Sequence, residues 1–177
     1  MTFEEKTLDS EQIYKGKVLN LRRDKVTTVN GETAFREIVE HSGGVVMAAI
    51  TKDGKMVMIR QFRKAVEQVV FEAPAGKVEP GEDLVEAAIR EPKEETGYTA
   101  NQIDSMGSYF SSCGYTSEKL NLFLCRDLMP GATDFDEHEA IIVEEYPLKD
   151  LFQQVLSGEI NDAKTALAIL LAYEKTR

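Results

Sequence analysis

Cysteine, long apolar runs and a surplus of positive charge are all lacking in this sequence of 177 residues. Its two cysteines, Cys113 and Cys125, have no histidine beside them, so we expect neither a disulfide-rich secreted scaffold nor a zinc pattern. No apolar run is long enough for a membrane span, and no charged-then-apolar leader is found. We therefore expect a reduced, cytoplasmic protein.

Acidic residues outnumber basic ones, 31 to 21, which gives a formal net charge of −10 at pH 7. A surface of this charge repels nucleic acid and anionic membranes, so we expect neither as a partner. Any anionic substrate would then have to be met by local cations or by a metal ion.

The length and the 42% hydrophobic content suit one domain with an N-terminal extension. Strand-like patterning begins near Ile13, and Asn30-Gly31 is typical of the tight turn of an N-terminal hairpin. A second, more apolar hairpin is predicted around the turn at Lys52–Gly54, with "GGVVMAAIT" and "KMVMIRQFR" as its central strands.

A loop punctuated by proline and glycine, "FEAPAGKVEPGE", precedes a predicted helix from Asp83 to Thr96, which Gly97 is placed to end. Further strands are predicted at 105–111, 120–125 and 140–146, and further helices at 148–156 and 162–175. The predicted packing face of the first helix carries Leu84, Val85, Ala88, Ile89 and Pro92. The predicted fold class is α/β (α+β), a layered domain around a mixed sheet.

Three glutamates follow Arg90 on the predicted helix: Glu91, Glu94 and Glu95. Spacings of three and four residues place them along one face, within reach of a common ion. Carboxylate oxygens are the ligands that a hard cation such as Mg²⁺ prefers. For an isolated E-x-x-E-E, however, a solvated acidic helix face is the commoner explanation.

A longer frame surrounds these glutamates. Gly76 is followed after five residues by Glu82, after seven more by Arg90-Glu91, and then by Glu94-Glu95-x-Gly97. This frame resembles the signature of the Nudix hydrolases, a loop–helix–loop that binds a divalent metal ion. The stretches "FREIVEHSGGVV", "IRQFR" and "GEINDAKTALAILL" look like the ADP-ribose pyrophosphatase branch of that family.

The resemblance implies a Nudix-type α/β/α sandwich around a mixed β-sheet, with an N-terminal β-hairpin extension. Residues 1–40 would be N-terminal strands that exchange across a homodimer, and 41–177 would be the Nudix domain. The implied activity is Mg²⁺-dependent hydrolysis of the pyrophosphate of ADP-ribose or a related nucleoside diphosphate sugar, with Mn²⁺ as an alternative ion. A nucleotide-sugar-binding module with weakened catalysis, and a pyrophosphatase for another nucleotide, stay open as alternatives.

The resemblance also implies metal ligands and catalytic groups. Glu91 and Glu95 would be the principal metal ligands, joined by the backbone carbonyl of Ala75. In the later stretch "TDFDEHEAI", Glu137 is our choice as general base and Glu139 as an additional metal ligand. The opposite assignment, and a merely solvated acidic loop, stay open.

Supporting roles fall to Glu94, as a further ligand or orienting group, and to Arg90, by pairing with a helix glutamate. Guanidinium groups match phosphate oxygens bidentately, although each arginine alone is more often a surface cation. The candidate substrate-binding residues are Arg36, Arg60, Arg63, Glu72 and Glu118.

Two positions depart from the family pattern. Pro92 stands where an aliphatic residue is usual, and we expect a tolerated kink, with Pro92 on the packing face and with Glu91 and Glu95 still converging. Cys113 stands where ADP-ribose hydrolases commonly carry proline, in Ser112-Cys113-Gly114. This second departure leaves the preferred nucleotide sugar open.

Overall fold

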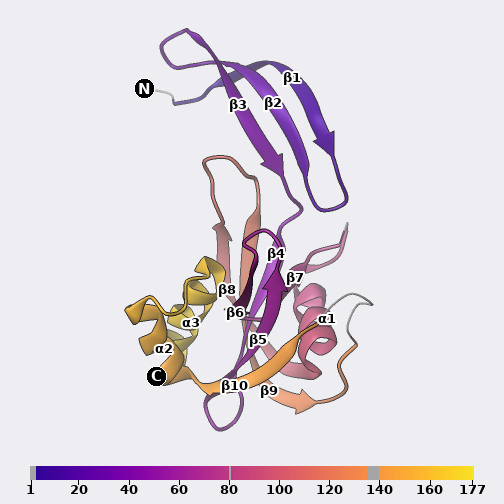
Figure 1. Cartoon of the computed structure of the whole chain (residues 1–177), viewed down its shortest axis with the longest axis vertical. Helices are drawn as coiled ribbons and strands as arrows, with labels where there is room; N and C mark the ends of the chain where they lie inside the picture. The colour runs from indigo at the N-terminus through magenta and orange to yellow at the C-terminus, as the bar shows by residue number, and fades with distance from the viewer. Residues whose placement is uncertain (1–2, 80, 135–139) are drawn as a thin grey trace. The chain divides into compact units, whose positions relative to one another are not determined.

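The computed structural model describes residues 3–79, 81–134 and 140–177 (Figure 1). The chain divides into two compact units. The first comprises Met1–Gly43 and Phe110–Lys119, and the second comprises Gly44–Tyr109 and Leu120–Arg177. No helix within the described ranges is long and apolar enough to cross a membrane.

The first unit is built on a three-stranded antiparallel sheet of β1 (Lys6–Lys15), β2 (Asn20–Thr27) and β3 (Thr33–Glu40) (Figure 1). The predicted hairpin at Asn30-Gly31 is confirmed, since Gly31 has a φ of 82° in the turn between β2 and β3. Strand β1 was not predicted over most of its length. Its residues are all exposed, so no apolar face marks it in the sequence.

The second unit contains two sheets (Figure 1). One is antiparallel, in the order β10 (Ile142–Pro147), β5 (Lys55–Arg63), β6 (Gln68–Glu72). The other is mixed, in the order β7 (Ala75–Lys77), β4 (Gly44–Ala49), β9 (Lys119–Pro130), β8 (Tyr98–Phe110), and in it β4 and β9 run parallel. Neither β6 nor β7 was predicted. Strand β6 begins in a stretch to which no element was assigned and ends in the predicted loop "FEAPAGKVEPGE", and β7 lies wholly within that loop.

The second predicted hairpin is only partly correct. Its turn forms, with a bridge between Ile50 and Met56 and with the Thr51 amide donating to the Lys55 carbonyl at 2.8 Å. The flanking strands, β4 and β5, then continue into different sheets. A local turn pattern does not determine which partner each strand pairs with beyond the turn.

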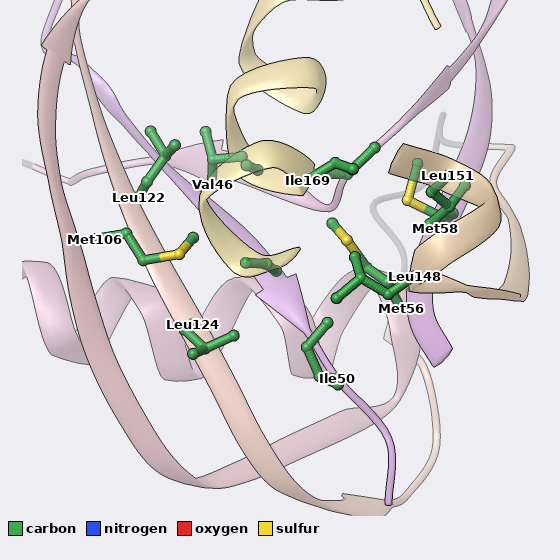
Figure 2. Close-up of a cluster of buried hydrophobic side chains, with 14 of the residues drawn as sticks. Val46, Ile50, Met56, Met58, Met106, Leu122, Leu124, Leu148, Leu151 and Ile169 are labelled. Carbon is green, nitrogen blue, oxygen red and sulfur yellow. The ribbon is translucent and has the colours of Figure 1, made fainter. Parts of the chain in front are cut away.

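Strand β4 is buried on both faces, which places it between two helical layers. Val45, Met47 and Ala49 join a cluster that includes Ala87 and Ala88 of α1 (Leu84–Thr96). Residues of the opposite parity face α2 (Leu148–Ser157) and α3 (Ala163–Thr176) in a second cluster (Figure 2). The second cluster includes Val46, Ala48, Ile50, Met56, Met58, Leu148, Leu151 and Ile169. The alternation along one strand thus produces the expected α/β/α sandwich.

Polar contacts hold β4 at its start and at its middle. The side chain of Asn121, 8% exposed, donates to the Gly44 carbonyl at 3.1 Å and accepts from the Ser108 hydroxyl at 2.6 Å. Further along the strand, the Met47 amide donates to the Pro74 carbonyl at 2.9 Å. The second bond also fixes the crossover that joins β6 to β7.

Helix α1 begins and ends as its sequence predicts. The Asp83 carboxylate accepts from the Val85 amide at 2.8 Å, and Gly97 closes the helix with a φ of 74°. Its packing face was predicted less well, because the larger apolar residues Leu84, Val85 and Ile89 are exposed. The buried residues are Ala87, Ala88, Pro92, Glu95 and Thr96. Small alanines, rather than the larger side chains, lie against the sheet.

The helix runs through Pro92 without interruption, and the predicted burial of this residue is confirmed. Proline cannot donate a backbone hydrogen bond to Ala88, a loss that inside a helix typically costs about 3 kcal/mol. The Pro92 carbonyl accepts from the Thr96 hydroxyl at 2.5 Å. The helical turn that follows the proline is therefore held by a side-chain hydrogen bond in addition to the backbone hydrogen bonds of the helix.

Helix α3 is capped by a charged residue whose contribution we expect to depend on pH. The Asp162 carboxylate accepts from the Thr165 amide at 3.1 Å and from the Lys164 ammonium at 2.8 Å. Burial alone would raise the pKa of this carboxyl, but Lys164 and the Thr165 bonds outweigh it and lower the pKa from 3.8. The charged form therefore stabilises the fold above that value, and the stabilisation is lost as the pH falls through the lower folded-state pKa.

Replacing Asp162 by asparagine should cost about 1 kcal/mol at pH 7, because asparagine still caps a helix but carries no charge. Urea unfolding at pH 7 and at pH 3 measures this, and the difference from the wild type should shrink at the lower pH. Asp150→Asn, in the exposed first turn of α2, is the matched control. A loss of equal size at both pH values would contradict the electrostatic account.

Candidate active site

Arg90, on α1, bonds to three glutamates at once. Its guanidinium donates to both oxygens of Glu82, at 2.8 and 3.0 Å, in a bidentate pair. The Nη1 atom also donates to Glu91 at 2.8 Å and to Glu94 at 3.0 Å. A further bond, at 3.2 Å, reaches the Lys77 carbonyl at the end of β7. Arg90 therefore ties the helix to the preceding loop and to the neighbouring strand.

These contacts shift the pKa values of the groups involved. The Arg90 guanidinium, together with the Glu79 amide, lowers the pKa of Glu82 to about 2. The three carboxylates raise the pKa of Arg90, with Glu82 the largest contributor. Burial raises the pKa of Glu91, against the opposing effect of Arg90. Glu91 is thus a partly desolvated carboxylate, for which the charged form is favoured by added positive charge.

Glu91 lies against β7 at Gly76. A Cβ atom at position 76 would stand 1.8 Å from the Glu91 carboxyl carbon and 1.9 Å from one of its oxygens. Any side chain at this position would therefore occupy the place of the carboxylate. The glycine that opens the predicted frame is required by this close approach of helix and strand.

Glu95 reaches the adjacent residue of the same strand. Its side chain is 7% exposed, and one carboxylate oxygen accepts from the Ala75 amide at 3.1 Å. Glu91 and Glu95 therefore lie against neighbouring residues of β7, although Pro92 stands between them in the helix. Their oxygens suit a hard divalent cation. Within the described ranges, no three acidic, histidine or cysteine side chains already lie close enough together to hold an ion.

Two candidate substrate-binding residues form an ion pair in which the glutamate is buried and the arginine is partly exposed. Arg63 donates to both oxygens of Glu72, at 2.7 and 3.1 Å, and the Glu72 side chain is 1% exposed. Lys164 bonds to the same carboxylate. The negative charges of Glu72 and Glu95 both raise the pKa of Arg63, whereas its burial lowers it. Arg63 is therefore held by the buried Glu72 carboxylate.

Arg60 is held by a different set of contacts. Its Nε atom donates to Glu144 at 2.6 Å, and its guanidinium carbon lies 4.2 Å from the centre of the Phe71 ring. The side chain remains 38% exposed. A partly exposed cation on an aromatic ring can still meet a phosphate without losing its support.

The other two candidate substrate residues belong to the first unit. Arg36 donates to both oxygens of Glu5, at 2.9 and 2.5 Å, on the exposed surface of the sheet. Glu118 lies 3.6 Å from the Nδ1 atom of His41. Arg36 thus has an ion-pair partner, and Glu118 a histidine neighbour, within the same unit.

The predicted base and additional ligand, Glu137 and Glu139, lie outside the described residues. Asp134, the last described residue before that stretch, lies against α1, where its amide donates to the Glu94 carbonyl at 2.9 Å. A hollow of about 380 Å³ opens at the same place. Its lining is made of Glu86, Ile89, Arg90, Lys93, Glu94 and Asp134.

Two residues next to the site were not anticipated: Lys164 and Thr165. Lys164 contacts Glu72, and the Thr165 hydroxyl accepts from the Ala73 amide at 2.9 Å. Both lie at the start of α3, more than ninety residues from their partners along the chain. The sequence predicts a helix that begins at Asp162, but no local pattern indicates which strand this helix end meets.

Comparisons with known proteins find family models and relatives that match most of this chain. The family model described as "NUDIX domain" matches residues 40–168 of this chain. A second model, described as "Nucleoside diphosphate sugar hydrolase N-terminal domain", matches residues 5–39. An ADP-ribose pyrophosphatase of Bacillus subtilis is 42% identical, over 95% of this chain and 92% of that protein. A methanol dehydrogenase activator of Bacillus methanolicus is 41% identical, over 94% and 91%. A solved structure of an ADP compounds hydrolase superposes with a TM-score of 0.85 at 25% identity, covering 97% of this chain and 94% of that one.

Proposed function

Because this chain belongs to the NUDIX domain family, we propose that it hydrolyses the pyrophosphate of ADP-ribose or a related nucleoside diphosphate sugar, releasing a nucleoside monophosphate and a sugar phosphate. The observation that carries the proposal is the placement of Glu91 and Glu95 against adjacent residues of β7, with Arg90 tying Glu91 to the rest of the acidic face. Relatives named for ADP-ribose and GDP-mannose pyrophosphatase activity support this substrate class.

Glu91, Glu95 and the backbone carbonyl of Ala75 would hold a divalent metal ion, with Glu94 as a further ligand or orienting group. We assign Mg²⁺ as the ion, with Mn²⁺ as an alternative. The metal ion would screen the two phosphates, polarise the attacked phosphorus and lower the pKa of a bound water. Glu137 as base and Glu139 as an additional ligand complete the proposal, with their exchange left open.

The protein's own cations would bind the anionic substrate. Arg63, bonded to both oxygens of the buried Glu72 carboxylate, is fixed in orientation before substrate arrives, and Arg60 is fixed on the Phe71 ring. Glu72 would mainly orient Arg63, because its carboxylate is buried. For Arg36 and Glu118, and for a homodimer that exchanges residues 1–40, the proposal rests on the family resemblance.

The test is a substrate panel with the full-length chain and Mg²⁺. We expect turnover of ADP-ribose to AMP and ribose 5-phosphate, separated by ion-exchange chromatography. The panel also includes other ADP-sugars, GDP-mannose, a dinucleotide and a nucleoside triphosphate. Turnover of only the dinucleotide or the nucleoside triphosphate would show that the substrate is another nucleotide. Absence of turnover of every nucleoside diphosphate sugar would sink the proposal.

A nucleotide-sugar-binding module without hydrolysis is the second candidate, and Pro92 is the observation that favours it. Ligand binding without Mg²⁺-dependent turnover would support this function, and Pro92→Leu should then restore activity. The uninterrupted helix and the retained contacts of Glu91 and Glu95 favour hydrolysis instead.

Arg90→Lys should lower kcat/KM by at least about tenfold, since a lysine ammonium cannot bond bidentately to Glu82 while also holding Glu91 and Glu94. Initial rates across a range of Mg²⁺ concentrations measure this, and the half-saturating metal concentration should rise. Lys93→Arg, at an exposed position of the same helix, is the matched control. Unchanged kinetics in Arg90→Lys would show that only the charge of Arg90 matters.

A further inference from the structure

The crossover from β6 to β7, residues 72–75, is fixed at each of its four positions. Arg63 and Lys164 bond to the Glu72 carboxylate, and the Ala73 amide donates to the Thr165 hydroxyl at 2.9 Å. The Met47 amide donates to the Pro74 carbonyl, and the Ala75 amide donates to Glu95. The last of these bonds orients a carboxylate of the acidic face.

The start of α3 provides two of these restraints. Thr165 is fully buried, and its hydroxyl accepts from Ala73 while donating to the Asp162 carboxylate. Asp162 also accepts from the Thr165 amide and from Lys164, so one carboxylate caps the helix and directs both side chains. The threonine hydroxyl thus donates one hydrogen bond, to Asp162, and accepts one, from Ala73.

We propose that Thr165, with Lys164 beside it, is a positioning residue for the metal site. By holding Ala73 and Glu72, the two side chains set the path of the crossover, and the crossover sets the Ala75 amide and carbonyl against Glu95. The inference rests on the proposed function in assigning a divalent metal ion to Glu91 and Glu95.

Outer groups that orient metal ligands typically change metal affinity by tenfold or more when removed. Thr165→Val keeps the shape of the side chain and removes the hydroxyl, so the buried Ala73 amide loses its acceptor. The crossover can then shift to find another partner, and Ala75 moves with it. The expected consequence is weaker metal binding, with a smaller change in kcat at saturating metal.

The experiment titrates the metal-free, full-length chain with Mn²⁺ and follows free Mn²⁺ by electron paramagnetic resonance. Thr165→Val should weaken Mn²⁺ binding by about tenfold, whereas Thr165→Ser, which keeps the hydroxyl, should restore most of it. Thr176→Val is the matched control, because that hydroxyl bonds to the Ala172 carbonyl within the same helix. Thermal unfolding of each variant reports stability separately.

Mn²⁺ binding by Thr165→Val equal to that of the wild type would overturn the inference, even if its melting temperature fell. Absence of Mn²⁺ binding by the wild type would overturn it as well. If Thr165→Val does not fold, Lys164→Met tests the same restraint through Glu72, with weaker Mn²⁺ binding expected. Mn²⁺ binding that follows these expectations, without turnover of any nucleoside diphosphate sugar, would support the positioning role and reject the proposed activity.

Discussion

Glu95→Gln should lower kcat/KM by about a thousandfold, equivalent to about 4 kcal/mol of transition-state stabilisation. The amide is nearly isosteric with the carboxylate, so its oxygen can still accept from the Ala75 amide. It carries no negative charge, however, and the proposed metal ion loses one of its two principal ligands. Steady-state rates at saturating Mg²⁺, together with Mn²⁺ binding, measure the effect.

The matched control is Glu86→Gln, the same substitution at an exposed position in the first turn of the same helix. It should leave metal binding unchanged, because Glu86 contacts neither β7 nor Arg90 in any observed bond. A Glu95→Gln variant with wild-type rates would remove Glu95 from the metal site. Equal losses in both variants would indicate a general effect of charge on the helix.

Gly76→Ala should reduce activity by at least about a hundredfold, because the added methyl group falls on the Glu91 carboxylate. Since a Cβ 1.8 Å from the carboxyl carbon cannot be accommodated, either the glutamate swings away or the helix separates from β7. Both results displace a proposed metal ligand. We expect the half-saturating Mg²⁺ concentration to rise along with the loss of rate.

Gly54→Ala separates this effect from a general loss of stability. Gly54 has a φ of 80° with open space around it, so alanine there introduces backbone strain of about 1 kcal/mol without a collision. Urea unfolding should show destabilisation in both variants, but activity should fall only in Gly76→Ala. Retained activity in Gly76→Ala would mean that Glu91 has another position from which it can act.

Local signals made much of the fold predictable. Asn30-Gly31 marked a turn, and Asp83 and Gly97 marked the ends of α1, because each acts on its immediate neighbours. The sequence could not show that β4 and β5 enter different sheets, since pairing is decided by residues far along the chain. The packing face of α1 was predicted correctly at Ala88 and Pro92 but not at its larger apolar residues, because close packing against a sheet favours small side chains.

The acidic face of the site was predictable for a different reason. Arg90 and the glutamates after it lie within two helical turns, so their spacing alone brings them together. The requirement for glycine at position 76 is visible only in the structure, where β7 lies against the helix and the Glu91 carboxylate fills the space of a side chain. Thr165 could not be found from the sequence at all, since its bond to Ala73 joins residues 92 positions apart and resembles that of many buried threonines.

The two buried faces of β4 have a consequence for how the strand finds its place. In a strand with one face exposed to solvent, polar and apolar residues alternate. A slip by one residue would then expose the apolar side chains and bury the polar ones. In β4 both parities are apolar, so a slip would exchange one set of buried side chains for another. The correct alignment must then be distinguished by volume and by polar contacts, of which the Asn121 bond to Gly44 and the Pro74 bond to Met47 are two. The bond between the Met47 amide and the Pro74 carbonyl thus helps to fix the register of β4 against the crossover. The same crossover places the Ala75 amide at Glu95.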